Sequence, residues 1–138
     1  MIGVTNQQTR RTIVVRLTGL ISPAEMQDFA DRYRAATDTY GGQPHLVLAD
    51  MRGMKTNTPA AASILQSAIA YARGRGVHSC AHISDDTVAR LQMARIAREV
   101  AAGDDVTIDV VSLDEAEIVL QEKRFELMKK MAAPGAAL

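Results

Sequence analysis

The chain has 138 residues, of which 47% are hydrophobic, and its 16 basic residues balance its 16 acidic ones. This length suits one domain with one core, which we place in residues 1–131, followed by a disordered tail in residues 132–138. The neutral charge balance disfavours a general nucleic-acid binder, which concentrates positive charge against phosphates. No apolar run approaches the roughly 20 residues that span a bilayer, so we expect no membrane insertion.

The chain contains a single cysteine, Cys80. One cysteine cannot form an intramolecular disulfide, which is typical of proteins in a reducing compartment. The first residues, MIGVTNQQTRR, lack the apolar core of a signal peptide. These features together predict a cytoplasmic location.

The first expected elements are a strand and a helix. Residues 12–18 (TIVVRLT) are rich in β-branched side chains and predict a strand, paired with a short one near residues 2–5. The sequence Ser22-Pro23-Ala24-Glu25 is a capping box that starts a helix. An apolar stripe predicts that this helix packs on a sheet: Met26, Phe29, Ala30, Tyr33 and Ala36.

The next strand-then-helix step frames a candidate site. Residues 44–50 (PHLVLAD) predict a buried strand and residues 51–57 (MRGMKTN) an exposed loop. A helix over residues 59–73 follows, with Thr58 as its cap.

Two more steps complete the pattern. Residues 77–84 (VHSCAHIS) predict a strand, followed by a helix capped at Ser84 or Asp85. Residues 106–112 (VTIDVVS) predict the last strand, and a second capping box at Ser112 starts a helix that reaches Met131.

Four strand-then-helix steps in one short chain predict an α/β layer structure with right-handed crossovers. We expect a sheet of four to five strands, mostly parallel or mixed, covered by about four helices. The N-terminal strand is expected to run antiparallel at one edge of this sheet.

This pattern resembles STAS domains, the fold of sulphate transporters and anti-sigma factor antagonists, and especially their SpoIIAA-like branch. The likeness spans roughly residues 10–122 and lies in the segments VVRLTGLISPAEMQDF, HLVLADMRGMK and DEAEIVL. It implies a non-enzymatic domain of bacterial transcription regulation that binds a regulatory protein, such as a kinase-type anti-sigma factor. No cofactor is expected.

In the regulatory members of that family, the loop after the central strand leads into an Asp-Ser-Ser-Gly motif whose serine is phosphorylated. Aligned on Asp50, this motif falls on Thr58-Pro59-Ala60-Ala61, which has neither the acidic residue nor the serine. Thr56 and Thr58 are therefore displaced candidates for a phosphoacceptor. Thr58 is better explained as a helix cap.

The leading hypothesis is that the loop after the central strand docks on a regulatory partner. Arg52, Met54 and Lys55 combine a flexible apolar group with two cations, as adaptable protein contacts do; the alternative is one buried methionine among solvated charges. Asp50 ends a strand where α/β sheets place ligand crevices, or it caps the following turn. The predicted partner-binding residues are Asp50, Arg52, Met54, Lys55, Thr56 and Thr58.

Two other classes of function remain open. A small-molecule or lipid-binding module would have an apolar pocket between helices and sheet, near Met51, Met54, Met93 and Tyr71. A metal protein or enzyme would use His78, Cys80 and His82, which alternate and so would project from one face of a strand. The alternative for these three is a covered sheet face, and no fourth ligand is apparent.

The last helix carries two apolar stripes. One consists of Leu113, Ala116, Leu120 and Leu127, and the other of Ile118, Phe125 and Met128. One core cannot easily cover both stripes. The second stripe therefore predicts a homodimer contact, or else a C-terminus that curls back over it.

Overall fold

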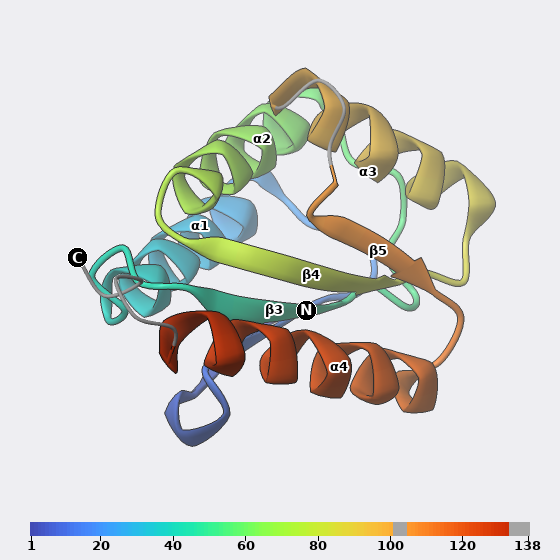
Figure 1. Cartoon of the computed structure of the whole chain (residues 1–138). Helices are drawn as coiled ribbons and strands as arrows, with labels where there is room; N and C mark the ends of the chain where they lie inside the picture. The colour runs from blue at the N-terminus through green and yellow to red at the C-terminus, as the bar shows by residue number, and fades with distance from the viewer. Residues whose placement is uncertain (101–104, 133–138) are drawn as a thin grey trace.

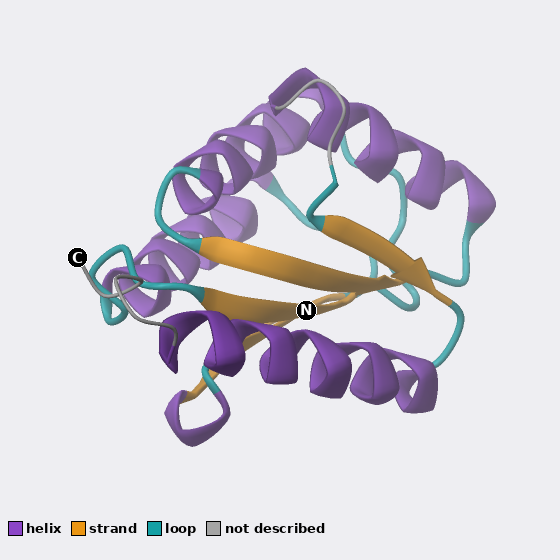
Figure 2. Cartoon of the chain, in the orientation of Figure 1, coloured by secondary structure: helices purple, strands orange, loops and turns teal. Residues whose placement is uncertain are grey.

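The computed structural model describes residues 1–100 and 105–132. Within these residues, five strands form one sheet in sequence order (Figure 2): β1 (Ile2–Gln7), β2 (Thr12–Leu17), β3 (His45–Asp50), β4 (Val77–Ile83) and β5 (Thr107–Val110). β1 runs antiparallel to β2, and the other neighbouring strands are parallel. The predicted α/β fold with a mixed sheet and an antiparallel edge strand is confirmed.

The helices cover the two faces of the sheet unequally, as Figure 1 shows. They are α1 (Pro23–Asp38), α2 (Pro59–Arg73), α3 (Thr87–Val100) and α4 (Leu113–Ala132), with a short 3₁₀ helix (Gln8–Arg10) between β1 and β2. From β2 to β5, each strand is followed by a helix and then by the next parallel strand on the same side of it in the sheet. Because such crossovers are right-handed, α1, α2 and α3 all lie on one face. α4 follows the last strand and covers the opposite face.

Alternation along the strands divides the core into two clusters. Side chains such as Val15 and Val47 pack under α1, α2 and α3. Leu48 and Ile83 pack under α4 instead. β3 is buried along its whole length, which explains why its sequence is an almost continuous apolar run rather than an alternating one.

The predicted caps of α1 and α2 are confirmed. Ser22 Oγ accepts a hydrogen bond from the backbone N–H of Glu25 at 3.1 Å, and the Glu25 carboxylate accepts one from the Ser22 N–H at 3.3 Å. Thr58 Oγ1 accepts from the N–H of Ala61 at 3.3 Å. In both helices proline occupies the first turn, where its missing N–H has no partner to lose.

The cap of α3 was predicted wrongly. Asp86, rather than Ser84 or Asp85, accepts a hydrogen bond from the backbone N–H of Ala89, at 2.9 Å. Asp85 binds the backbone N–H of Gly53 at 2.8 Å, so its carboxylate serves the loop after β3. Three consecutive polar residues can each cap a helix, and the tertiary contact decides which one does.

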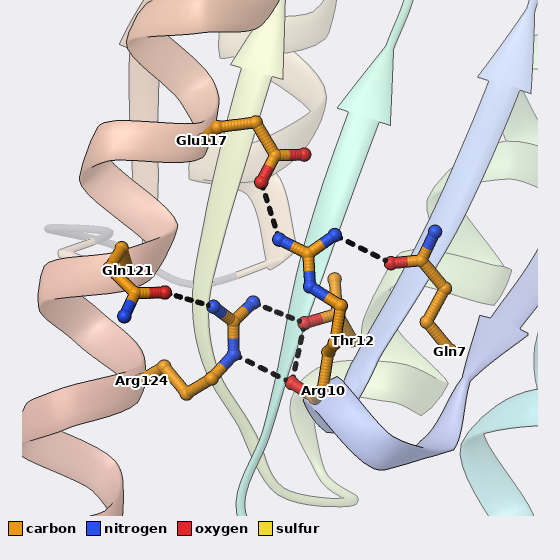
Figure 3. A network of polar contacts seen from close by, with 6 residues as sticks. All are labelled: Gln7, Arg10, Thr12, Glu117, Gln121 and Arg124. Atoms are coloured by element: carbon orange, nitrogen blue, oxygen red, sulfur yellow. Dashed lines mark hydrogen bonds and ion pairs between the residues drawn. The ribbon is translucent and has the colours of Figure 1, made fainter.

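A polar network fastens α4 to the turn between β1 and β2 (Figure 3). The Arg124 guanidinium donates to the backbone oxygen of Arg10 at 2.9 Å and to Thr12 Oγ1 at 3.0 Å. It also donates to Gln121 Oε1, within α4, at 2.8 Å. The Arg10 side chain pairs in turn with Glu117. Burial lowers the pKa of Arg124, and the hydrogen bonds compensate part of that desolvation.

The last helix extends slightly further than predicted. Ala132 is still helical, so it does not belong to the expected disordered tail, and residues 133–138 lie outside the described part of the chain. Among the helices that the structure describes, none has the length and apolar character that crossing a bilayer requires.

Candidate functional site

A cavity of about 210 Å³ lies between the sheet and the three helices α1, α2 and α3. Its apolar wall comes from Val15, Phe29, Val47, Ala49, Met51, Leu65, Ile69, Val77, Met93, Ala94 and Ala97. The two alanines of α3 and Ala49 of β3 carry only methyl groups, which leaves space between the layers. Engineered apolar cavities of about 150 Å³ bind benzene. This cavity can therefore hold a small ring or a short chain.

Polar side chains line the same cavity. They are Tyr33, Arg73, Cys80, His82, Arg98, Thr107 and Asp109. Arg73 at the end of α2 donates a hydrogen bond to Thr107 Oγ1 at 2.6 Å, which joins α2 to the start of β5. Largely apolar walls with a few placed polar groups are the usual make-up of small-molecule sites.

His82 and Asp109 form the best-defined polar pair of the cavity. They are register partners on the neighbouring strands β4 and β5, and His82 Nδ1 lies 3.0 Å from Asp109 Oδ1. Only 6% of the His82 side chain is exposed, against 55% of the Asp109 side chain. His82 Nε2 is buried and has no hydrogen-bond partner in the described part of the chain. The pair thus holds a buried, unsatisfied ring nitrogen on a side chain that lines the cavity.

Tyr33 and Cys80 lie near each other in the cavity wall. Burial raises the pKa of the Tyr33 phenol, the nearby Cys80 thiol raises it further, and Arg73 partly offsets the shift. The phenol therefore stays protonated at neutral pH and can act as a hydrogen-bond donor. Cys80 is the only cysteine of the chain, which makes it a natural reporter of the cavity.

The prediction that His78, Cys80 and His82 share one face of a strand is wrong. The pairing of β4 with β3 shifts by one residue at His78, as in a β-bulge, and breaks the alternation there. His78 Nε2 lies 3.9 Å from a carboxylate oxygen of Glu126 on α4, whereas Cys80 and His82 line the cavity. In residues 1–100 and 105–132, no three His, Cys, Asp or Glu side chains are grouped to hold a metal ion.

Asp50, at the end of β3, organises the loop that follows. Its buried carboxylate accepts hydrogen bonds from Arg52 Nε at 2.9 Å, from Arg52 Nη2 at 2.7 Å and from the Arg52 backbone N–H at 3.2 Å. Arg16 Nη1 on β2 lies 3.4 Å away. The hydrogen bonds from Arg52 lower the pKa of Asp50 against the opposing effect of burial. The turn-capping alternative for Asp50 is therefore confirmed.

The loop between β3 and α2 is braced by backbone contacts rather than free. Met54 is 1% exposed and packs in the core, and Lys55 N–H donates to the Gly19 carbonyl at 3.0 Å. Asn57 N–H donates to Gln92 Oε1 of α3 at 2.9 Å, and Gln92 Nε2 donates back to the Asn57 carbonyl at 3.1 Å. The expectation of an exposed Met54 contact is wrong, and the alternative of a buried methionine among charges is correct.

The outer surface of this loop is polar. Lys55, Thr56 and Thr58 are exposed, and 40% of the Arg52 side chain is accessible beside its pair with Asp50. Thr58 is engaged as the cap of α2, whereas Thr56 carries no such structural role. Of the predicted partner-binding residues, Arg52, Lys55, Thr56 and Thr58 thus lie together on the accessible side of this loop, whereas Asp50 and Met54 are buried.

The predicted ligand pocket is partly correct in its residues. Met51 and Met93 line the cavity, but Met54 does not. Tyr71 lies on the outer side of α2, where its hydroxyl donates to Asp38 at 2.6 Å and its ring contacts the Arg75 guanidinium. Sequence reasoning missed Asp109. Its signal was a single acidic residue inside the apolar strand VTIDVV.

The second apolar stripe of α4 is exposed. The exposed fractions are 63% for Ile118, 74% for Phe125 and 53% for Met128, while Leu120 and Leu127 face the core. Exposure in the single chain fits the expected homodimer contact but does not test it, so this contact stays a prediction.

Comparisons with known proteins give no assignment. No protein-family model matches the chain, and no curated protein sequence matches it.

Proposed function

We propose that this protein binds a small, largely apolar molecule in the cavity between the sheet and helices α1, α2 and α3. The observation that carries the proposal is the volume of about 210 Å³ with apolar walls and a few placed polar groups. Binding there fills space between the sheet and the helices, so it stabilises the folded state. A carrier or a ligand-sensing domain needs such a site, and neither role requires chemistry on the ligand.

Occupation of the cavity has a physical route to the loop after β3. Met93 on α3 lines the cavity, and its neighbour Gln92 holds Asn57 of the loop through two hydrogen bonds. A ligand that braces α3 against the sheet therefore also braces this loop. A sensing role is supported by this connection.

Toluene is a suitable probe for the proposal, because it is apolar and only one methyl group larger than benzene, which apolar cavities of about 150 Å³ already bind. We expect toluene to raise the melting temperature and to slow alkylation of Cys80 by iodoacetamide, since Cys80 lines the cavity. The substitution Ala97→Phe should fill the cavity and abolish both effects. Ala70→Phe, at an exposed position of α2, is the matched control and should retain them. Equal responses of the two variants would refute the proposal.

A second candidate function is docking of a cytoplasmic regulatory protein on the loop after β3. It is supported by the exposed Lys55 and Thr56 beside the half-exposed Arg52. The resemblance to anti-sigma factor antagonists suggests a kinase-type anti-sigma factor as the partner. Docking would compete with the partner's hold on a sigma factor, with the balance set by their relative affinities.

This second candidate is tested by affinity capture with a purified kinase-type anti-sigma factor. If the loop is the contact, the double variant Lys55→Ala and Thr56→Ala should capture the partner at least about tenfold more weakly than the wild-type protein does. Lys129→Ala combined with Lys130→Ala, on exposed positions of α4, is the control pair. Loss of capture in both double variants, or in neither, would place the contact elsewhere.

A further inference from the structure

We propose that the ligand of the cavity carries an O–H donor on an apolar body, as small phenols and alcohols do, and that this group donates a hydrogen bond to His82 Nε2. The inference rests on the proposed function and specifies the chemical class of the ligand.

The first step is the tautomer of His82. An ionised carboxylate only accepts hydrogen bonds, so the contact of 3.0 Å between His82 Nδ1 and Asp109 Oδ1 requires Nδ1 to carry a proton. In the neutral ring, Nε2 then has a free lone pair and acts as an acceptor. Asp109 thereby determines which kind of group His82 can bind.

The second step is the position of that acceptor. His82 lines the cavity with a side chain that is only 6% exposed, and its Nε2 is buried without a hydrogen-bond partner among the described residues. A buried acceptor is unfavourable unless a donor reaches it. A ligand hydroxyl at this point satisfies the acceptor, whereas a purely apolar ligand leaves it unsatisfied.

The third step concerns charge. Arg73 and Arg98 also line the cavity and would favour a carboxylate, whereas the Asp109 carboxylate beside His82 repels one. Arg73 donates to Thr107, and Arg98 is exposed. Two buried polar side chains therefore remain in the cavity wall: Tyr33, which can donate a hydrogen bond, and His82, whose Nε2 is the unsatisfied acceptor and suits a neutral donor.

Three probes built on the same methylbenzene ring distinguish an apolar ligand, a neutral donor and a carboxylate: toluene, p-cresol and p-toluate. Dissociation constants are measured by calorimetry on the full chain at pH 8. We expect p-cresol to bind wild type about tenfold or more tightly than toluene, because it alone satisfies Nε2. His82→Phe keeps a ring but removes the acceptor and should erase this preference. His82→Gln keeps an acceptor oxygen and should retain part of the preference for p-cresol over toluene. Asp109→Ala removes the group that holds the His82 proton on Nδ1, so it should reduce this preference.

The outcomes separate the two proposals. Equal binding of p-cresol and toluene to wild type would overturn the role of His82 and leave the apolar cavity intact as a binding site. Tightest binding of p-toluate would assign the head group to the arginines and also overturn it. No binding of any probe, with unchanged alkylation of Cys80, would overturn both proposals. If His82→Phe fails to fold, the comparison of His82→Gln and Asp109→Ala with wild type decides.

Discussion

The carboxylate of Asp50 accepts two parallel hydrogen bonds from the guanidinium of Arg52: Nε donates to Oδ1 at 2.9 Å, and Nη2 donates to Oδ2 at 2.7 Å. Such a bidentate pair between residues two positions apart makes the chain turn sharply at the end of β3. The buried Asp50 charge is compensated, and the start of the following loop has a fixed direction. The loop surface proposed to meet a partner is thus preorganised.

Asp50→Ala should lower the free energy of unfolding by about 2 kcal/mol, because the substitution removes charge-assisted hydrogen bonds to a buried carboxylate. Urea unfolding followed by circular dichroism measures the change. Asp28→Ala breaks the exposed pair with Arg32 on α1 and is the control. We expect the control to change stability by less than about 0.5 kcal/mol. Similar losses in the two variants would contradict the structural role of Asp50.

Met54→Ala should destabilise the protein by about 2 to 5 kcal/mol, because Met54 is 1% exposed and its truncation leaves a cavity in the core. Met128→Ala makes the same chemical change at an exposed position of α4 and should shift stability by less than about 0.5 kcal/mol. Thermal and urea unfolding of the two variants provide the comparison. A mild effect of Met54→Ala would mean that the loop after β3 is less tightly packed than described.

Stability should depend on pH through His45. Burial lowers the pKa of His45 below its ordinary value, so the unfolded chain binds a proton more readily than the folded one. Stability is therefore full above the ordinary histidine pKa of about 6.5, and is lost as pH falls toward the lower folded value. Urea unfolding between pH 8 and pH 5 should show this loss in wild type and a smaller one in His45→Gln. An equal loss in the variant would assign the pH dependence to other groups.

Gly76→Ala should destabilise the protein strongly. Gly76 has a φ of +100°, and an added Cβ would lie 2.5 Å from the Gln43 carbonyl oxygen, so both backbone conformation and contact oppose it. Gly74→Ala is the control, since an added Cβ there meets its nearest atom, the Tyr71 carbonyl oxygen, at 3.7 Å. Melting temperatures should fall for Gly76→Ala and stay near wild type for Gly74→Ala. Equal melting temperatures would contradict the backbone geometry at Gly76.

Removal of the Arg124 side chain should loosen α4 from the sheet. Arg124→Ala deletes hydrogen bonds to the Arg10 carbonyl and Thr12 Oγ1, and we expect a loss of about 1 to 3 kcal/mol. Hydrogen exchange of α4 amides should accelerate as well. Arg90→Ala, at an exposed position of α3, is the control. Unchanged exchange in α4 would show that the Arg124 contacts do not hold this helix.

The parts of the fold predicted correctly from sequence are those fixed by local chemistry. Ser22 and Thr58 cap their helices because their side chains reach backbone amides within one turn, whatever the rest of the chain does. The order of strands and helices follows from the length and composition of each segment. These signals need only a few neighbouring residues.

The features that sequence reasoning missed depend on distant contacts. Alternation along β4 fails at His78 because the pairing with β3 shifts there, and no local pattern marks that shift. Met54 is buried by a loop held to Gly19 and, further on, to Gln92 of α3. The pairing of His82 with Asp109 required the register of β4 against β5. An apolar pocket between helices and sheet was among the expectations, but its lining beyond Met51 and Met93 depends on how three helices pack, which composition cannot specify.

The position of α4 has a consequence for synthesis of the chain on the ribosome. Leu48 and Ile83 belong to strands made early, but their apolar cover is α4, the last element of the described structure to be translated. Until residues 113–132 emerge, a nascent chain that has already formed its first three helices exposes an apolar face of its sheet. Such a face invites chaperones or self-association. Premature termination before α4 should therefore yield an aggregating product rather than a smaller folded one.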